Sequence, residues 1–214
     1  MSLPSNDMMA AIAATRFGLG ARPGEIDAAR DDPRGFLSAQ IRAEGADQPQ
    51  GGEDSAQRLA EVSDYQMQKR DAKAMGNPKS PPVKDLQKDL RAQAGDDFLA
   101  RARLGATTDA AFRERWTLFW ANHFTVSSTS LAVTSLAGPF EQEAIRPHVF
   151  GRFEDLLVAS STHPAMLLYL DQAQSVGPDS KAAAYQRKTG KKAGGLNENL
   201  AREILELHTV GVDA

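Results

Sequence analysis

The sequence predicts an all-α protein, an irregular multi-helix domain with long loops and no significant β-sheet. Apolar residues make up 41% of the 214 residues and charged residues 25%, which is the balance of a folded globular chain. Apolar side chains recur at helical spacing in one segment after another. β-branched residues never alternate with polar ones over a useful length, so no strand is expected. The length allows one large domain or two small ones. We expect a single helical domain over residues 1–214.

Composition and charge exclude several classes of function. The net charge of −3 gives no general attraction to a phosphate backbone, so nucleic acid is not an expected partner. The chain has no cysteine, which excludes disulfides, thiolate metal sites and a cysteine nucleophile. The longest strongly apolar run, Ala165 to Leu170, is far shorter than the roughly 20 residues that span a bilayer. No transmembrane segment is therefore expected.

The N-terminal residues bear on the compartment. Met8 to Ala14 is apolar, but Asp7 precedes it where a signal peptide would carry Lys or Arg. We expect a helix to about Thr15 and no signal peptide. Two compartments stay open. The chain as it stands is expected in the cytoplasm, and a place in the cell envelope is possible if a native signal was removed.

The first half of the chain is expected to form helices separated by loops. Pro33 occupies a favoured first helical position. Residues 55–75 are strongly polar with few apolar anchors, which predicts an exposed helix, and another helix is expected over 83–104. Two segments rich in Gly, Pro and polar residues predict loops or linkers, at 45–54 and 76–82.

The second half is expected to hold the core. One helix carries the densest aromatic cluster of the chain, made of Phe112, Trp116, Phe119, Trp120 and Phe124. We expect this aromatic cluster at the centre of the core. Shorter helices should follow near 131–137, 140–145, 153–160 and 164–170. Residues 175–195 predict a long mobile loop, and a last helix over 197–210 should end at Gly211.

His123 falls on the same side of its helix as the aromatic cluster, because successive residues are separated by about 100° around a helix axis. Its imidazole is therefore expected to face the core. A buried imidazole needs hydrogen-bond partners and favours its neutral form, since burial disfavours the charge. His123 is either a satisfied core histidine or, alternatively, a ligand or catalytic base.

The same projection turns Glu203 and His208 of the last helix inward. They fall within a wide apolar arc made of Leu200, Ala201, Ile204, Leu205, Leu207 and Val210. A carboxylate inside such an arc is costly unless it is paired. The candidate partners come from other segments and are Arg146, Arg152, His123 and the caps near His163.

A metal site on this helix alone is excluded, because Glu206 and His208 project about 200° apart. A site that combines Glu203 with His123 and His163 stays possible beside a structural ion-pair network. The residues point to no particular cofactor.

Two further polar residues flank the helix over 164–170. His163 precedes Pro164 and is expected to cap the helix, where the positive end of the helix dipole favours neutral imidazole. Asp171 follows the helix, where an acid is electrostatically unfavourable. We expect Asp171 to contact another segment rather than to stabilise its own helix.

Four stretches together resemble the bacterial family named domain of unknown function 1800. They are RFGLGARPGE at 16–25, FWANHFTV at 119–126, HPAMLLYLD at 163–171 with QSVGP at 174–178, and GLNENLAREILELHTVGVD at 195–213. The resemblance covers nearly the whole chain and implies no reaction. It implies that the polar residues singled out above belong to the family's signature motifs. Members typically continue into a second helical half, so this chain is expected to be the N-terminal half of a longer protein, and many members are exported to the cell envelope.

Three classes of function are compatible with these observations. The first is a structural or interaction role, with a buried polar network joining helices and the C-terminal half of the same protein as partner. The second is a hydrolase or metal-dependent enzyme whose site is shared with that half, with His123, His163, Asp171, Glu203 and His208 as the candidate catalytic residues. The third is binding of an anionic or polysaccharide partner through the basic loop, with Lys181, Arg187, Lys188, Lys191 and Lys192.

Overall fold

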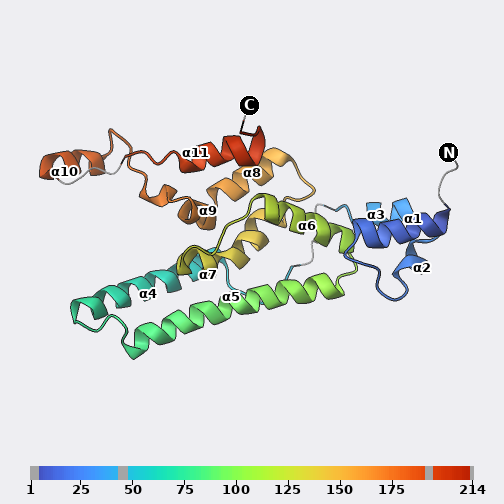
Figure 1. The fold of residues 1–214 in the computed structure, drawn as a ribbon, viewed down its shortest axis with the longest axis horizontal. Helices are drawn as coiled ribbons and strands as arrows, with labels where there is room; N and C mark the ends of the chain where they lie inside the picture. Colours follow the sequence, from blue (N-terminus) through green and yellow to red (C-terminus); the bar gives the residue numbers. More distant parts are fainter. Residues whose placement is uncertain (1–4, 43–47, 191–194, 213–214) are drawn as a thin grey trace.

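The computed structural model describes residues 5–42, 48–190 and 195–212. Every regular element in these ranges is helical and none is a strand, as the sequence predicts (Figure 1). Segments of 3-10 or π-helix are labelled η. In chain order the elements are α1 Asn6–Ile12, η1 Ala13–Phe17, α2 Glu25–Ala29, α3 Pro33–Ser38, α4 Ser55–Ala74, α5 Pro81–Thr107, α6 Ala111–His123, α7 Leu131–Phe140, η2 Glu141–Ile145, α8 Phe153–Thr162, α9 Pro164–Tyr169, η3 Gln172–Gln174, α10 Lys181–Thr189, α11 Asn199–Glu203 and η4 Ile204–Thr209.

The two longest helices, α4 and α5, lie side by side and carry α7 across them (Figure 1). Asp54 and Gln57 form a capping box at the start of α4, which satisfies two backbone N–H groups that the first turn leaves free. The following loop ends at Ser80, and α5 begins at Pro81. The loop expected over 76–82 therefore ends two residues earlier, because proline fits the first turn of a helix.

The hydrophobic core is centred on α7, η2, α8 and α9. Its buried side chains are Phe124, Leu136, Phe140, Ala144, Ile145, Val149, Leu156, Ala165, Met166 and Leu170. Phe124 is the one member of the aromatic cluster among these buried side chains, so the cluster as a whole is not the centre of this core, contrary to expectation. Trp116 and Trp120 pack against its edge, and Phe119 is 51% exposed. The buried face of α6 instead carries Arg113, Glu114 and Thr117.

Residues 175–195 do not form one long loop, because they contain α10. Ser180 caps this helix by accepting a hydrogen bond from the Ala183 N–H at 3.1 Å, and Gly190 ends it in the left-handed conformation at φ 65°. Figure 1 shows α10 at the end of the molecule opposite the N-terminal helices. Lys191 and Lys192 of the expected basic loop lie outside the described residues, as do residues 45–47 of the first expected loop.

Residues 48–54, the described remainder of that first loop, contain no helix. No helix in the described part of the chain combines the length and the apolar character that a membrane crossing needs.

Candidate functional site

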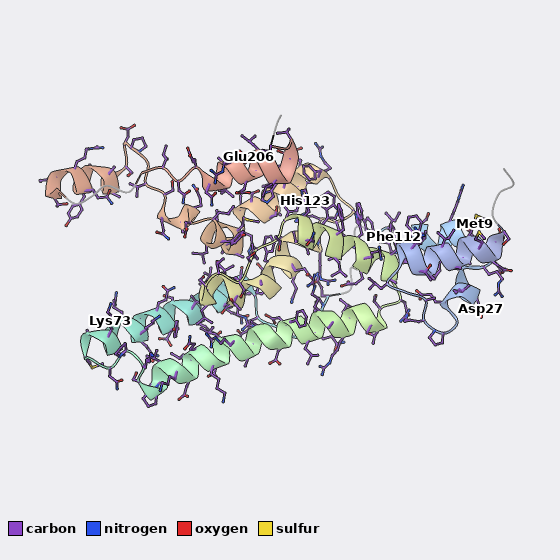
Figure 2. All side chains as sticks on the ribbon, viewed as in Figure 1. Met9, Asp27, Lys73, Phe112, His123 and Glu206 are labelled. Carbon is purple, nitrogen blue, oxygen red and sulfur yellow. The ribbon has the colours of Figure 1, made fainter. Side chains whose placement is uncertain are left out.

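His123 and His208 lie beside each other and join α6 to η4. His123 is the last residue of α6 and is half-buried, whereas His208 is buried. The Nε2–H of His123 donates to the main-chain oxygen of His208 at 3.1 Å, and the two ring centroids are 6.2 Å apart. Figure 2 shows His123 at the end of α6 that lies towards the segment carrying Glu206. His123 thus ties the aromatic helix to the C-terminal one.

The imidazole of His208 is desolvated and keeps one nitrogen unpartnered. Its Nδ1 is buried, and no described residue forms a hydrogen bond with it. Burial lowers the pKa of His208, and the neighbouring His123 lowers it further, while Glu203 acts in the opposite direction. His208 is therefore neutral at pH 7, with one ring nitrogen free to form a further hydrogen bond.

The apolar arc expected for the last helix does not form. After Glu203 the helix widens into the π-helical η4, where the Val210 N–H donates to the Leu205 oxygen at 3.0 Å. A π-turn changes the angle between successive side chains, so the projection made for an α-helix fails. His208 still turns inward, but Leu205 and Leu207 are 58% and 59% exposed.

Glu203 is half-buried rather than interior. In the described ranges it has no ion-pair or hydrogen-bond partner. Its charge acts on His208 by raising the pKa of that imidazole. Two of the partners that the sequence suggested are engaged elsewhere. Arg152 pairs with the exposed Glu154 at 2.7 Å, and Arg146 pairs with Glu114.

His163 holds the start of α9 and also contacts the start of α4 through Glu143. Its Nδ1 accepts a hydrogen bond from the Ala165 N–H at 3.1 Å, as a helix cap does. The proton is therefore on Nε2, which donates to Glu143 Oε2 at 3.2 Å. The same carboxylate accepts from the Ser55 N–H and Oγ–H, both at 2.7 Å.

This arrangement links the starts of α4 and α9 through η2. Glu143 stands between Ser55 and His163, so the serine hydroxyl bonds to the carboxylate and not to the imidazole that would activate a nucleophile. Burial lowers the pKa of His163, and the hydrogen bond and charge of Glu143 act against that shift.

Asp171 lies on the surface and supports the chain just before α11. Its φ is 55°, the left-handed region that costs a non-glycine residue about 1 kcal/mol. The Gln174 Nε2 donates to its carboxylate at 2.9 Å, and the Asn197 Nδ2 donates to its main-chain oxygen at 3.2 Å. The Asn197 side chain also accepts from the Asn199 N–H at 3.0 Å. The Asp171 carboxylate thus bonds locally, and only the main-chain oxygen of Asp171 contacts the distant segment.

The five candidate residues fall into three separate groups rather than one site. His123, Glu203 and His208 form the first, whereas His163 and Asp171 each bond within a group of their own. Among the residues that the structure describes, no three His, Asp or Glu side chains are placed to hold a metal ion.

A buried ion-pair network joins α6, η2 and α5, and the sequence did not reveal it. Arg146 is 1% exposed, and its Nη1 and Nη2 donate to the two carboxylate oxygens of Glu114, each at 2.7 Å. Glu141 accepts from Arg146 Nε at 3.0 Å and pairs with Arg101 at 2.7 Å. Burial alone would lower the pKa of Arg146, but the hydrogen bonds and charges of Glu114 and Glu141 raise it overall.

A second buried pair joins α4 to α5 beneath α7. Arg58 is 2% exposed, and its Nη2 lies 3.3 Å from each carboxylate oxygen of Asp97. Burial raises the pKa of Asp97, Arg58 opposes that shift, and Asp96 adds to it. Gly138 of α7 packs directly on this carboxylate, since a Cβ built there would lie 2.5 Å from Asp97 Oδ2.

Comparison with known proteins places the chain in a family. The model of the family described as "Protein of unknown function (DUF1800)" matches residues 12–214. No curated protein and no solved structure matches the chain. Since the match spans nearly the whole sequence, the chain belongs to the DUF1800 family of proteins of unknown function.

Proposed function

We propose that this chain has a structural and interaction role, in which buried ion pairs hold the helices and an exposed apolar surface binds the C-terminal half of the same protein. The surface, called here the C-terminal apolar face, consists of Leu205, Leu207, Val210 and Val212. These side chains are 58%, 59%, 64% and 70% exposed. Their exposure carries the proposal, because four large apolar side chains are exposed within one short segment, and exposed apolar surface marks interaction sites.

The C-terminal apolar face continues towards α6. His208 follows Leu207 in the chain and its main-chain oxygen accepts a hydrogen bond from His123. The His123 ring stacks on the half-exposed Phe119 at 6.5 Å between centroids. Completing the burial of one leucine stabilises a contact by about 1 kcal/mol, given roughly 1.5–3 kcal/mol for full burial. Several such side chains together suffice for a stable intramolecular contact.

The buried network supports this role by fixing the shape of the surface. The Arg146 and Glu114 side chains are desolvated and satisfy one another with paired hydrogen bonds. Ion pairs of this kind add little net stability but penalise any arrangement that separates the charges. The helix that presents His123 is therefore held in one orientation.

The test is binding between this chain and a separately produced C-terminal half, measured by isothermal titration calorimetry. The double variant Leu205→Ser and Leu207→Ser should weaken binding about tenfold or more, at roughly 1 kcal/mol for each side chain. Met67→Ser with Met75→Ser is the matched control, because these methionines are 50% and 78% exposed on another part of the surface. Equal affinity for all three proteins would refute the proposal.

A second candidate function is an enzyme whose site is shared with the C-terminal half. It is favoured by the unpartnered Nδ1 of His208 beside the C-terminal apolar face. A catalytic imidazole must keep access to substrate in the whole protein. Deuterium exchange at the His208 C2–H in the full-length protein distinguishes the two functions: exchange as fast as at the partly exposed His148 favours the enzyme, and strong protection favours a sealed interface.

A further inference from the structure

A groove of about 590 Å³ lies between α4, α5 and the first turn of α7. Its cationic wall is formed by Lys69, Lys73 and Arg91, with Arg70 at the side. Val62 and Leu131 form its apolar floor, and Tyr65 also lines it. Tyr65, Lys69 and Lys73 follow one another at intervals of four residues, which places them on one face of α4. Figure 2 labels Lys73 near the C-terminal end of that helix. We call this feature the cationic groove.

The positive charge of the cationic groove is not neutralised. Lys69, Lys73 and Arg91 are exposed and have no ion-pair partner among the residues that the structure describes. Arg70 Nε lies 3.6 Å from Asp71 Oδ1, where both side chains are largely exposed, so that pair contributes little. The described lining contains no Asp or Glu. The groove therefore attracts anions.

Tyr65 supplies an independent observation that points to a ligand. Its side chain is 7% exposed and lines the groove, and the Lys69 Nζ lies 5.5 Å from its ring centroid. No described residue forms a hydrogen bond with its hydroxyl. A buried phenol normally has a hydrogen-bond partner. The hydroxyl is therefore available to form a hydrogen bond with a ligand in the groove, in place of water.

The start of α7 adds main-chain donors to the same groove. Ser130 Oγ accepts from the Val133 N–H at 3.3 Å, which leaves the N–H groups of Leu131 and Ala132 without a partner in their own helix. Both residues line the groove. Free N–H groups and the positive end of the helix dipole favour an anion there.

We propose that the cationic groove binds a phosphate-bearing ligand. The donors outnumber what the two oxygens of one carboxylate accept, whereas a phosphate group offers more acceptor sites and a higher charge. The apolar floor of Val62 and Leu131 would hold the organic part of such a molecule. The groove is made by other helices than the C-terminal apolar face, so this inference is independent of the proposed function.

The experiment measures binding to the full-length protein by calorimetry with inorganic pyrophosphate, and by co-sedimentation with phosphatidylglycerol vesicles. The first probe represents a free phosphate compound and the second a lipid headgroup. Lys69→Gln, Lys73→Gln and Arg91→Gln should each weaken binding about two- to fivefold, and the triple variant more than about tenfold. Binding should also weaken with added salt.

Tyr65→Phe separates a ligand role from a structural one. The change removes only the hydroxyl, which has no described protein partner, so the thermal midpoint should stay unchanged while binding falls about two- to fivefold. Lys88→Gln is the matched control, because Lys88 is exposed on α5 outside the groove lining. The proposal is supported if either probe binds, if the groove variants weaken that binding, and if Lys88→Gln does not. No binding of either probe, or equal loss in the control, overturns it.

Discussion

Replacing Gly138 with alanine tests the packing of α7 on α5. A Cβ at this position would lie 2.5 Å from Asp97 Oδ2, 2.7 Å from Cγ and 2.8 Å from Cβ. Rotating the carboxylate does not relieve these contacts, because two of the three involve the base of the Asp97 side chain. Movement of the helix would disturb the pair with Arg58, which holds both carboxylate oxygens at 3.3 Å.

The expected cost follows from overpacking a close contact, about 2 kcal/mol. For a chain of this length that corresponds to a fall in the thermal midpoint of roughly 4–8 °C. Differential scanning calorimetry measures the midpoint, and urea unfolding gives the free energy. Gly95→Ala in α5 is the matched control: nothing lies within 4 Å of its Cβ position, so it should stabilise the protein by about 0.5–1 kcal/mol.

The reasoning would be refuted by an alanine at 138 that leaves the midpoint unchanged, or by an equal loss in the Gly95→Ala protein. The first outcome would mean that α7 does not lie against Asp97. The second would mean that alanine is unfavourable in these helices for a reason other than contact.

Two further predictions concern buried charge. Glu114→Gln removes a charge opposite the desolvated Arg146 and should lower the free energy of unfolding, measured in urea, by about 3 kcal/mol. Glu154→Gln in an exposed pair should change it by less than about 1 kcal/mol. Equal losses of stability in the two variants would contradict the buried network. His163 and His208 have pKa values lowered by burial from 6.5, so they stay neutral in the folded chain while the unfolded chain takes up protons below about pH 6.5. The stability that these two histidines contribute should therefore be fully present above that pH and should fall as the pH decreases below it. Urea midpoints at about pH 7.5 and 5.5 measure the loss, which should be smaller in His163→Asn. An equal loss in that variant would contradict the assignment.

Local signals predicted much of the fold. The helix expected over 55–75 is α4, because Asp54 caps its start and Gly76 ends it with a φ of 75°. The cap of α9 by His163 also followed from the neighbouring sequence. Signals of the same kind exist around α10, where Ser180 and Gly190 lie at the two ends of a run of good helix formers.

Long-range pairing could not be predicted in the same way. The aromatic cluster gave α6 an apparent core face, but Glu114 on the opposite side is buried because Arg146, far along the chain, neutralises it. For α11 and η4 the predicted apolar arc was wrong because the helix geometry changes. The π-turn rotates the side chains that follow Glu203, and hydrophobic periodicity carries no signal for such a turn.

The central claim is tested most directly by photo-crosslinking in the full-length protein. A photoreactive amino acid in place of Leu207 should crosslink to residues of the C-terminal half, and one in place of the exposed Met75 should not. Mass spectrometry identifies the crosslinked peptides. If position 207 forms no crosslink, or crosslinks only to residues 1–214, the assignment of the C-terminal apolar face as a contact surface is contradicted.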